Sequence, residues 1–194
     1  MKNEIQKQNF QAFTQATNVS VTSGRLPQVP GVREITMDDI ELGEKIGQGG
    51  FSVIHKGKLN GSTVAIKKIF DPRLTDELLQ EIQNEIVMLG ILRHPNICIL
   101  MGVIPKIPDI YIVFEHVTGS LFDMLHMKKG QIDIPIDKRV RIARDTAIVF
   151  EYMHHLGIVH RDIKSHNVLI DDNFTVKVCD FGLAKFNVSL FIIY

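Results

Sequence analysis

The sequence predicts an α+β fold, in which a strand-rich N-terminal half precedes a C-terminal half that begins with helix. β-branched and apolar residues are concentrated in short runs between residues 40 and 70, which is typical of strands. A longer segment, residues 137–157, has apolar residues at helical spacing. Because strands come first and the main helix later, the order disfavours regular alternation of strand and helix in a parallel sheet.

The composition is that of an ordinary globular chain. The 194 residues include 22 Lys+Arg and 22 Asp+Glu, so the formal net charge is zero, and 45% are hydrophobic. A neutral chain lacks the basic footprint of a nucleic-acid or anionic-membrane binder, so any polyanion must be held by a local site. No apolar run approaches the ~18 residues that cross a bilayer. Two cysteines and an N-terminus without a signal-peptide core favour a reducing, cytoplasmic location.

The first part of the chain is polar and lacks periodicity. We expect residues 1–36, which are rich in Gln, Asn, Thr and Ser, to be a flexible leader. Residues 37–117 then form the first structural part, and the pair Asn60-Gly61 predicts a type I′ hairpin within it. Its three opening antiparallel strands are expected at 40–47, 51–59 and 62–70.

A helix is expected after these strands, in the segment LTDELLQEIQNEIVMLGIL. Its apolar residues lie on one stripe, formed by Leu78, Ile82, Ile86 and Leu89. The sequence Arg93-His94-Pro95 ends the helix, and apolar strands follow at 97–104 and 110–115.

Residues 118–194 form the second part, which is dominated by a helix over Ile136–Leu156. Gly157 is expected to follow the helix as its C′ residue. The predicted buried stripe of the helix consists of Val140, Ala143, Ala147, Phe150 and Met153. Short strands are expected at 158–160, 167–170 and 175–180.

A glycine cluster, Gly47-Gln-Gly49-Gly50-Phe-Ser52, lies between two predicted strands. A Rossmann phosphate loop needs a helix directly after it, so this context disfavours one, and a Walker A sequence is absent. Two interpretations remain: a tight turn with no ligand, or a hairpin whose backbone N–H groups approach phosphate oxygens.

Lys67 lies in the strand sequence Val64-Ala-Ile-Lys67, where its apolar neighbours suggest burial. A buried amine needs a partner, and Glu85 lies toward the inward face of the predicted helix. We therefore predict a Lys67–Glu85 ion pair. The alternatives are that Lys67 reaches solvent or that Glu81 is the partner.

The segment His160-Arg-Asp162-Ile-Lys164-Ser-His-Asn167 is densely polar although it lies between two apolar strands, which indicates a site. Asp180 ends the next apolar strand and precedes Phe181-Gly182. Carboxylate and amide oxygens of this kind suit Mg²⁺ binding and proton abstraction. A zinc site is a poor alternative, because the usual cysteine or carboxylate ligands do not accompany the candidate histidines, His154, His155, His160 and His166.

Taken together, these motifs resemble those of eukaryotic protein kinases in their order along the chain. The resemblance rests on the glycine-rich loop from Gly47, VAIK ending at Lys67, Glu85 before LRHPNI, HRDIKSHN and Asp180-Phe181-Gly182. Five motifs in the same order make it specific. The sequence HRDIKSHNVLID is similar to that of the tyrosine-kinase-like group of Ser/Thr kinases.

The resemblance implies a two-lobe, ATP- and Mg²⁺-dependent serine/threonine protein kinase, whose partners are ATP and a protein substrate. Lys67 would contact the α- and β-phosphates and pair with Glu85, and Asp162 would accept the substrate hydroxyl proton. Lys164 would neutralise the transferring phosphate. The metal ligands implied are Asn167 and Asp180.

The resemblance also implies a set of nucleotide-binding residues. Phe114 falls at the gatekeeper position, and the backbone of the following residues would hydrogen-bond the adenine. The whole implied set is Ile46, Gly47, Gly49, Ser52, Ile54, Ala65, Lys67, Phe114, Glu115, Val117 and Leu169.

Two departures from the family pattern affect what we expect. Ser52 stands where the last loop glycine would be. The resemblance covers roughly Ile40–Lys185, after which the apolar sequence FNVSLFIIY replaces the expected activation segment and further helices. We therefore expect an incomplete C-terminal lobe with an uncovered helix stripe, and little activity. The alternative function is a catalytically inactive nucleotide-binding or partner-docking kinase fragment; the sequence does not define an oligomeric state.

Overall fold

The computed structural model describes residues 11, 24–70, 74–126 and 134–186. The chain divides into two compact units. The N-terminal unit contains residues 13–91 and 99–116, and the C-terminal unit contains residues 1–12, 92–98 and 117–194.

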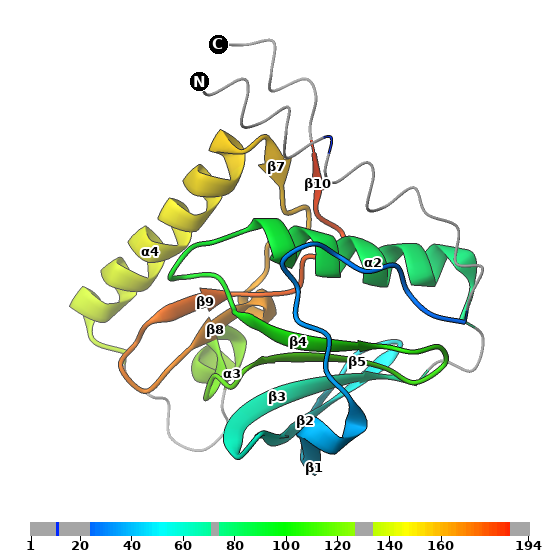
Figure 1. Cartoon of the computed structure of the whole chain (residues 1–194). Helices are drawn as coiled ribbons and strands as arrows, with labels where there is room; N and C mark the ends of the chain where they lie inside the picture. Colours follow the sequence, from blue (N-terminus) through cyan, green and yellow to red (C-terminus); the bar gives the residue numbers. More distant parts are fainter. Residues whose placement is uncertain (1–10, 12–23, 71–73, 127–133, 187–194) are drawn as a thin grey trace. The chain divides into compact units, whose positions relative to one another are not determined.

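The N-terminal unit is built on a five-stranded antiparallel sheet with the strand order β1-β2-β3-β5-β4 (Figure 1). Its strands are β1 (Ile40–Gln48), β2 (Ser52–Leu59), β3 (Ser62–Ile69), β4 (Leu100–Pro105) and β5 (Ile110–Glu115). A short 3-10 turn, η1 (Met37–Asp39), leads into β1, and the helix of the unit is α2 (Asp76–Ile91). The three predicted opening strands and the helix after them are therefore confirmed.

Hydrophobic clusters form on both faces of this sheet, because successive side chains of a strand point to opposite faces. On β3, Val64 and Ile66 belong to one cluster, whereas Ile69 belongs to the cluster that contains Ile82 and Ile86 of α2. The helix thus covers one face. The β2–β3 connection is the predicted turn, since Asn60 and Gly61 have φ of 48° and 84°, the left-handed values that a type I′ turn requires at both positions.

Residues 24–36 correct the prediction of a flexible leader. Leu26, Val29 and Ile35 are buried, with 1%, 6% and 5% exposure. The segment hydrogen-bonds to β4 through its backbone: Leu26 N–H donates to the Pro105 carbonyl (2.8 Å) and Ile35 N–H to the Val103 carbonyl (3.0 Å). Its few apolar residues are irregularly spaced and so show no periodicity, although they are enough to anchor it. Apart from Gln11, residues 1–23 of the predicted leader lie outside the described residues.

The C-terminal unit combines helices with short strands. Its helices are α3 (Leu121–His126) and α4 (Ile136–His155), with a 3-10 turn, η2 (Ser165–Asn167). Its strands are β6 (Gly119–Ser120), β7 (Ile158–Val159), β8 (Val168–Ile170), β9 (Val176–Val178) and β10 (Lys185–Phe186). They form a three-stranded sheet, β6-β8-β9, and the pair β10-β7. All of the tail FNVSLFIIY except Phe186 lies outside the described residues.

The buried face of α4 matches the predicted stripe only in part. Met153 is buried as predicted and Phe150 is half-buried, whereas Val140 is 61% exposed and Ala143 and Ala147 are exposed as well. Ile142 and Val149, which lie outside the predicted stripe, are buried. The helix has apolar residues on two flanks. It packs on β7 and β9, and the flank that contains Ile142 is the buried one. Gly157 ends the helix as predicted, with φ of 74° and its N–H donated to the His154 carbonyl (2.9 Å).

Within the described part of the chain we find no helix whose length and hydropathy would let it traverse a bilayer.

Candidate active site

A buried ion pair joins β3 to α2. The Lys67 Nζ lies 2.7 Å from Glu85 Oε2. The side chain of Lys67 is 19% exposed and that of Glu85 is 5% exposed. Glu81, one helical turn earlier, is exposed. The predicted Lys67–Glu85 pair is therefore confirmed, and the alternative partner is wrong. Each charge offsets the cost of burying the other.

The strand register places further predicted residues on the same face of the sheet as Lys67. Ile54 of β2 lies directly opposite Lys67, and Gly47 of β1 lies opposite Ile54. On the other side of β3, Ala65 lies opposite Phe114 of β5. Opposed residues of antiparallel strands, and residues two apart on one strand, share a face. One face of the sheet therefore presents the apolar residues Ile54, Ala65 and Phe114 beside Lys67.

The glycine-rich loop is a tight turn between β1 and β2. The N–H of Gly49 donates to the carbonyl of Ser52 (2.8 Å), which closes the turn. Ser52 is buried, and its Oγ would lie 3.2 Å from a Cβ added at Gly49. The serine that departs from the family pattern is thus accommodated because its neighbour in space is glycine. Ile46, just before the loop, is 46% exposed.

The remaining predicted nucleotide residues are divided between the two units. Glu115 ends β5, where its N–H donates to the Ile99 carbonyl (3.0 Å) and its Oε1 accepts from the Ile99 N–H (2.8 Å). Val117 and Leu169 belong to the C-terminal unit. Leu169 is half-buried on β8, between Ser120 of β6 and Lys177 of β9.

The polar segment 160–167 folds around the carboxylate of Asp162. Its Oδ2 accepts from Lys164 Nζ (2.6 Å) and from Asn167 Nδ2 (2.9 Å), and the same amide donates to the Asp162 carbonyl (2.9 Å). The hydrogen bond from the Lys164 ammonium lowers the pKa of Asp162, and that bond also raises the pKa of Lys164. Asp162 is consequently ionised at neutral pH and held in place from two sides.

His160 connects this segment to the strand that precedes Asp180. Its Nε2 lies 3.1 Å from the Cys179 carbonyl, and its Nδ1 accepts the Asp162 N–H (3.3 Å), which together require the neutral Nε2–H tautomer. The ring is 1% exposed and contacts the rings of Phe150 and Phe181. Burial lowers its pKa and so favours this neutral form. The sequence interpretation missed this positioning role; the place of His160 at the end of the apolar strand sequence IVH was the available signal.

Asn167 and Asp180 are brought close by backbone hydrogen bonding. The N–H of Cys179 donates to the Asn167 carbonyl (3.0 Å). Asp180 directly follows Cys179, so this hydrogen bond holds the backbone of Asp180 near Asn167. Asp180 has φ of 65°, and Phe181 beside it is fully buried. Because the Asn167 amide nitrogen is directed at Asp162, its Oδ1 is turned away from that carboxylate.

The donor chemistry of Asn167 and Asp180 fits magnesium. An amide oxygen and a carboxylate are hard ligands, and Mg²⁺ is usually held by one or two such groups together with substrate phosphates. Over residues 11, 24–70, 74–126 and 134–186, the structure has no group of three or more His, Cys, Asp or Glu side chains that could hold a metal ion.

The histidines of the zinc alternative make separate contacts. His155 Nδ1 lies 2.8 Å from the Glu151 carbonyl, and His166 stacks on Phe122 with ring centroids 3.8 Å apart. His160 contacts the rings of Phe150 and Phe181, so each of these three histidines has its own separate contacts.

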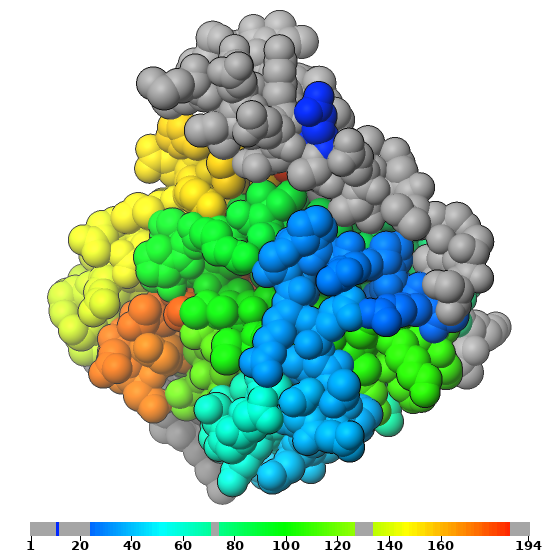
Figure 2. All heavy atoms as spheres, in the orientation of Figure 1, coloured from blue at the N-terminus to red at the C-terminus, as the bar shows by residue number. Residues whose placement is uncertain are grey.

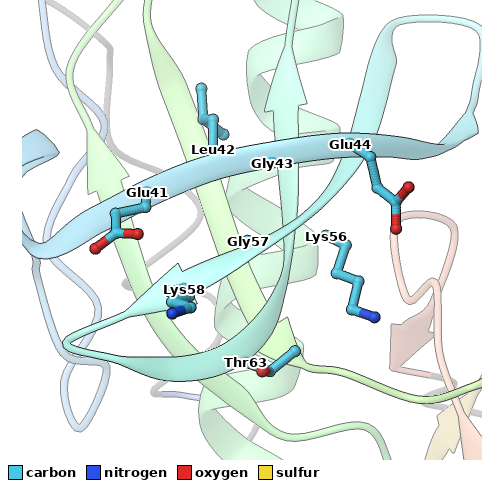
Figure 3. Close-up of a pocket in the computed structure, with 8 residues that line it drawn as sticks. All are labelled: Glu41, Leu42, Gly43, Glu44, Lys56, Gly57, Lys58 and Thr63. Atoms are coloured by element: carbon cyan, nitrogen blue, oxygen red, sulfur yellow. The ribbon is translucent and has the colours of Figure 1, made fainter.

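A cavity of about 340 Å³ opens on the strands β1, β2 and β3 (Figure 3). The predicted nucleotide residues are absent from its lining, which carries charges of both signs. The lining residues are Glu41, Leu42, Gly43, Glu44, Lys56, Gly57, Lys58 and Thr63. A Cβ added at Gly57 would lie 2.3 Å from the Glu41 carbonyl oxygen, so close strand packing explains this glycine. The cavity is therefore separate from the candidate site.

Replacing Glu85 with glutamine should destabilise the N-terminal unit by about 1.5–3 kcal/mol, the range for hydrogen bonds to charged groups. The reason is that the Lys67 charge would remain largely buried opposite a neutral amide. Urea unfolding followed by circular dichroism measures the change. Glu81→Gln is the control on the exposed face of α2, with an expected effect within about 0.5 kcal/mol. Equal effects of the two substitutions would contradict the assigned pair.

Comparison with known proteins adds an independent finding. Residues 40–189 match the family described as "Protein kinase domain". The chain is 41% identical over 162 residues to "Probable serine/threonine-protein kinase SIS8" of Arabidopsis thaliana, covering 82% of this chain and 16% of that protein. It is 38% identical to "Serine/threonine-protein kinase CTR1" of the same plant, over 82% of this chain and 20% of the relative. "Probable serine/threonine-protein kinase drkB" of Dictyostelium discoideum is 37% identical, over 81% and 23%. The chain thus spans less than a quarter of the length of these relatives.

Proposed function

The chain belongs to the protein kinase family, and from this premise we propose that it transfers the γ-phosphoryl group of ATP to serine or threonine hydroxyls of proteins. The observation that carries the proposal is the arrangement around Asp162, an ionised carboxylate held by Lys164 and Asn167. Phosphoryl transfer depends mainly on positioning and on electrostatic stabilisation, and this arrangement supplies both.

Residues of the N-terminal unit bind the nucleotide in this proposal. Ile54, Ala65 and Phe114 contact the base from their shared face of the sheet, and Lys67 binds the α- and β-phosphates while Glu85 holds its ammonium in place. The Glu115 N–H is already donated to the Ile99 carbonyl, so a hydrogen bond from the adenine has to use the Glu115 carbonyl.

The backbone N–H groups of the glycine-rich loop follow the phosphates. The other residues proposed to border the nucleotide are Ile46, Gly47, Gly49, Ser52, Val117 and Leu169.

Residues of the C-terminal unit hold the metal. The Oδ1 of Asn167 and the carboxylate of Asp180 bind Mg²⁺, whose charge, when it is bound, neutralises and orients the phosphates. His160 holds the two ligands in a fixed relative position, because it hydrogen-bonds both to Asp162 and to Cys179, the residue before Asp180.

The chemical step uses Asp162 as the proton acceptor. The acceptor hydroxyl oxygen bonds to the γ-phosphorus, its proton passes to the Asp162 carboxylate, and the bond to the β–γ bridging oxygen breaks to release ADP. Lys164 stabilises charge on the phosphoryl group in transit. The lowered pKa of Asp162 keeps it deprotonated and ready to accept at neutral pH.

The preference for serine and threonine is supported by Lys164, which lies two residues after Asp162, and by the names of the relatives. Placement in the tyrosine-kinase-like group is supported by the sequence HRDIKSHNVLID, which is similar to that group. We also propose a cytoplasmic location, supported by the low cysteine content of two residues in 194.

A second candidate function is nucleotide binding or partner docking without phosphoryl transfer. It is favoured by one observation, the apolar flank of α4 that remains exposed, where Ile136 and Val140 are 74% and 61% accessible. Exposed apolar patches of this kind are typical of interaction surfaces.

Thermal unfolding with and without Mg-ATP separates the candidates. At 100 times its dissociation constant the nucleotide should add about 2.7 kcal/mol to the stability of the folded chain, and a generic protein substrate should acquire phosphoserine or phosphothreonine by mass spectrometry. Stabilisation without transfer would favour the second candidate. No stabilisation would contradict the first candidate and leave only partner docking of the second.

A further inference from the structure

Residues 24–36, which we call the strap, are tied at both ends to β4. At the start, Leu26 N–H donates to the Pro105 carbonyl (2.8 Å); at the end, Ile35 N–H donates to the Val103 carbonyl (3.0 Å), and Val103 N–H donates to the Arg33 carbonyl (3.0 Å). β4 is an edge strand of the sheet, so the strap satisfies backbone groups that would otherwise be open.

Between these ends the strap crosses α2 (Figures 1 and 2), where its blue residues lie against the green helix. Gln83 Nε2 donates to the Pro27 carbonyl (3.2 Å). Two turns further on, a Cβ added at Gly90 would lie 3.2 Å from Val29 Cγ1 and 3.1 Å from Val32 Cγ2. The strap therefore contacts α2 at two positions along the helix, Gln83 and Gly90. The second contact is possible because Gly90 has no side chain.

The strap and Lys67 hold α2 from opposite sides. An α-helix turns by about 100° per residue, which places Glu85 roughly half a turn around the axis from both Gln83 and Gly90. Glu85 is bonded to Lys67 at 2.7 Å, while the two strap contacts lie on the other side. A helix held in this way has little freedom to move away from the sheet or to rotate.

We propose that the strap is a positioning element for catalysis: it holds α2 so that Glu85 stays bonded to Lys67. The functional domain accordingly includes residues 24–36, which precede the family match at residues 40–189. The catalytic part of this inference rests on the proposed kinase function. A strap that merely covered apolar surface would stabilise the whole unit evenly, whereas a positioning strap acts selectively on α2 and on phosphate binding.

The first test replaces the polar contact. Gln83→Leu removes the bond to the Pro27 carbonyl, and Gln80→Leu makes the same substitution on the exposed face of α2. In the full chain we expect Gln83→Leu to speed hydrogen exchange of the α2 amides by about tenfold while leaving β2 and β3 unchanged. Gln80→Leu should change neither. Faster exchange throughout the unit, or no difference between the two variants, overturns the proposal.

The second test uses Gly90. Leucine is a better helix former than glycine, so Gly90→Leu should protect α2 amides if the strap were not packed there. We expect the opposite, faster exchange, because the new side chain must displace Val29 and Val32. Adding Val29→Ala and Val32→Ala makes room and should restore protection. Increased protection in Gly90→Leu alone, or no restoration in the triple variant, overturns the proposal.

Binding measurements separate this inference from the proposed function. In Gln83→Leu the affinity for Mg-ATP should fall about tenfold while the affinity for adenosine is unchanged, because only phosphate binding uses Lys67. An equal loss for both ligands overturns the positioning role. If the unaltered chain binds neither ligand, the proposed function fails, and the exchange experiments still decide whether the strap holds α2.

Discussion

Replacing Asp180 with asparagine should abolish Mg²⁺-dependent phosphoryl transfer. The substitution keeps the size of the side chain but removes the only carboxylate among the two proposed metal ligands, leaving two neutral amide oxygens for a doubly charged cation. Since transfer relies on positioned charge more than on covalent chemistry, this loss affects the largest contribution to the rate.

The measurement is a magnesium titration of two quantities, phosphate incorporation and the thermal stabilisation by ATP. In Asp180→Asn both should lose their dependence on magnesium. Asp172→Asn is the matched control, because Asp172 is exposed eight residues earlier in the chain, and it should behave like the unaltered protein. Retention of the magnesium dependence in Asp180→Asn would exclude Asp180 as a ligand.

Asp162→Asn should lower kcat by about 10²–10⁴-fold, the range expected when a general base is removed. ATP affinity should stay nearly the same, since the contacts of Asp162 are to Lys164 and Asn167 within its own segment. The amide oxygen of the new side chain can still accept these two bonds, so the loss is of basicity and not of structure.

Steady-state kinetics measures kcat, and nucleotide-dependent melting measures ATP affinity. Asp172→Asn is again the control. The kinetic loss should appear equally in kcat and kcat/KM. A comparable loss of ATP affinity and turnover would show instead that Asp162 acts through nucleotide binding. Together with Asp180→Asn, this variant distinguishes metal binding from proton transfer.

Local patterns predicted the elements of the N-terminal unit well. Three strands were expected at 40–47, 51–59 and 62–70, and the structure has them at Ile40–Gln48, Ser52–Leu59 and Ser62–Ile69. Their alternation and the Asn60-Gly61 turn are properties of adjacent residues, and they need no tertiary information. The Lys67–Glu85 pair was also predictable, because two charges on apolar faces have few other ways to be buried.

The strap and α4 show where such patterns fail. Residues 24–36 are held by hydrogen bonds to β4, about 70 residues away in sequence by the numbers of the paired residues, and no local period reports such pairing. In α4, two apolar flanks were available, and the one that became buried contains Ile142 and not Val140. Helical spacing identifies a flank but cannot choose between two.

By itself, the sequence determined the chemistry of this protein: which groups carry charge, which are hard metal ligands, and the order of motifs that places the chain in its family. Only the tertiary structure decided how those groups are held. It made His160 a neutral link between Asp162 and Cys179 and directed the Asn167 amide nitrogen toward Asp162. It also placed the strap against α2, on the side away from Lys67. The physical reason is that residue types are local properties, whereas burial, tautomer and orientation depend on contacts between segments far apart in the chain.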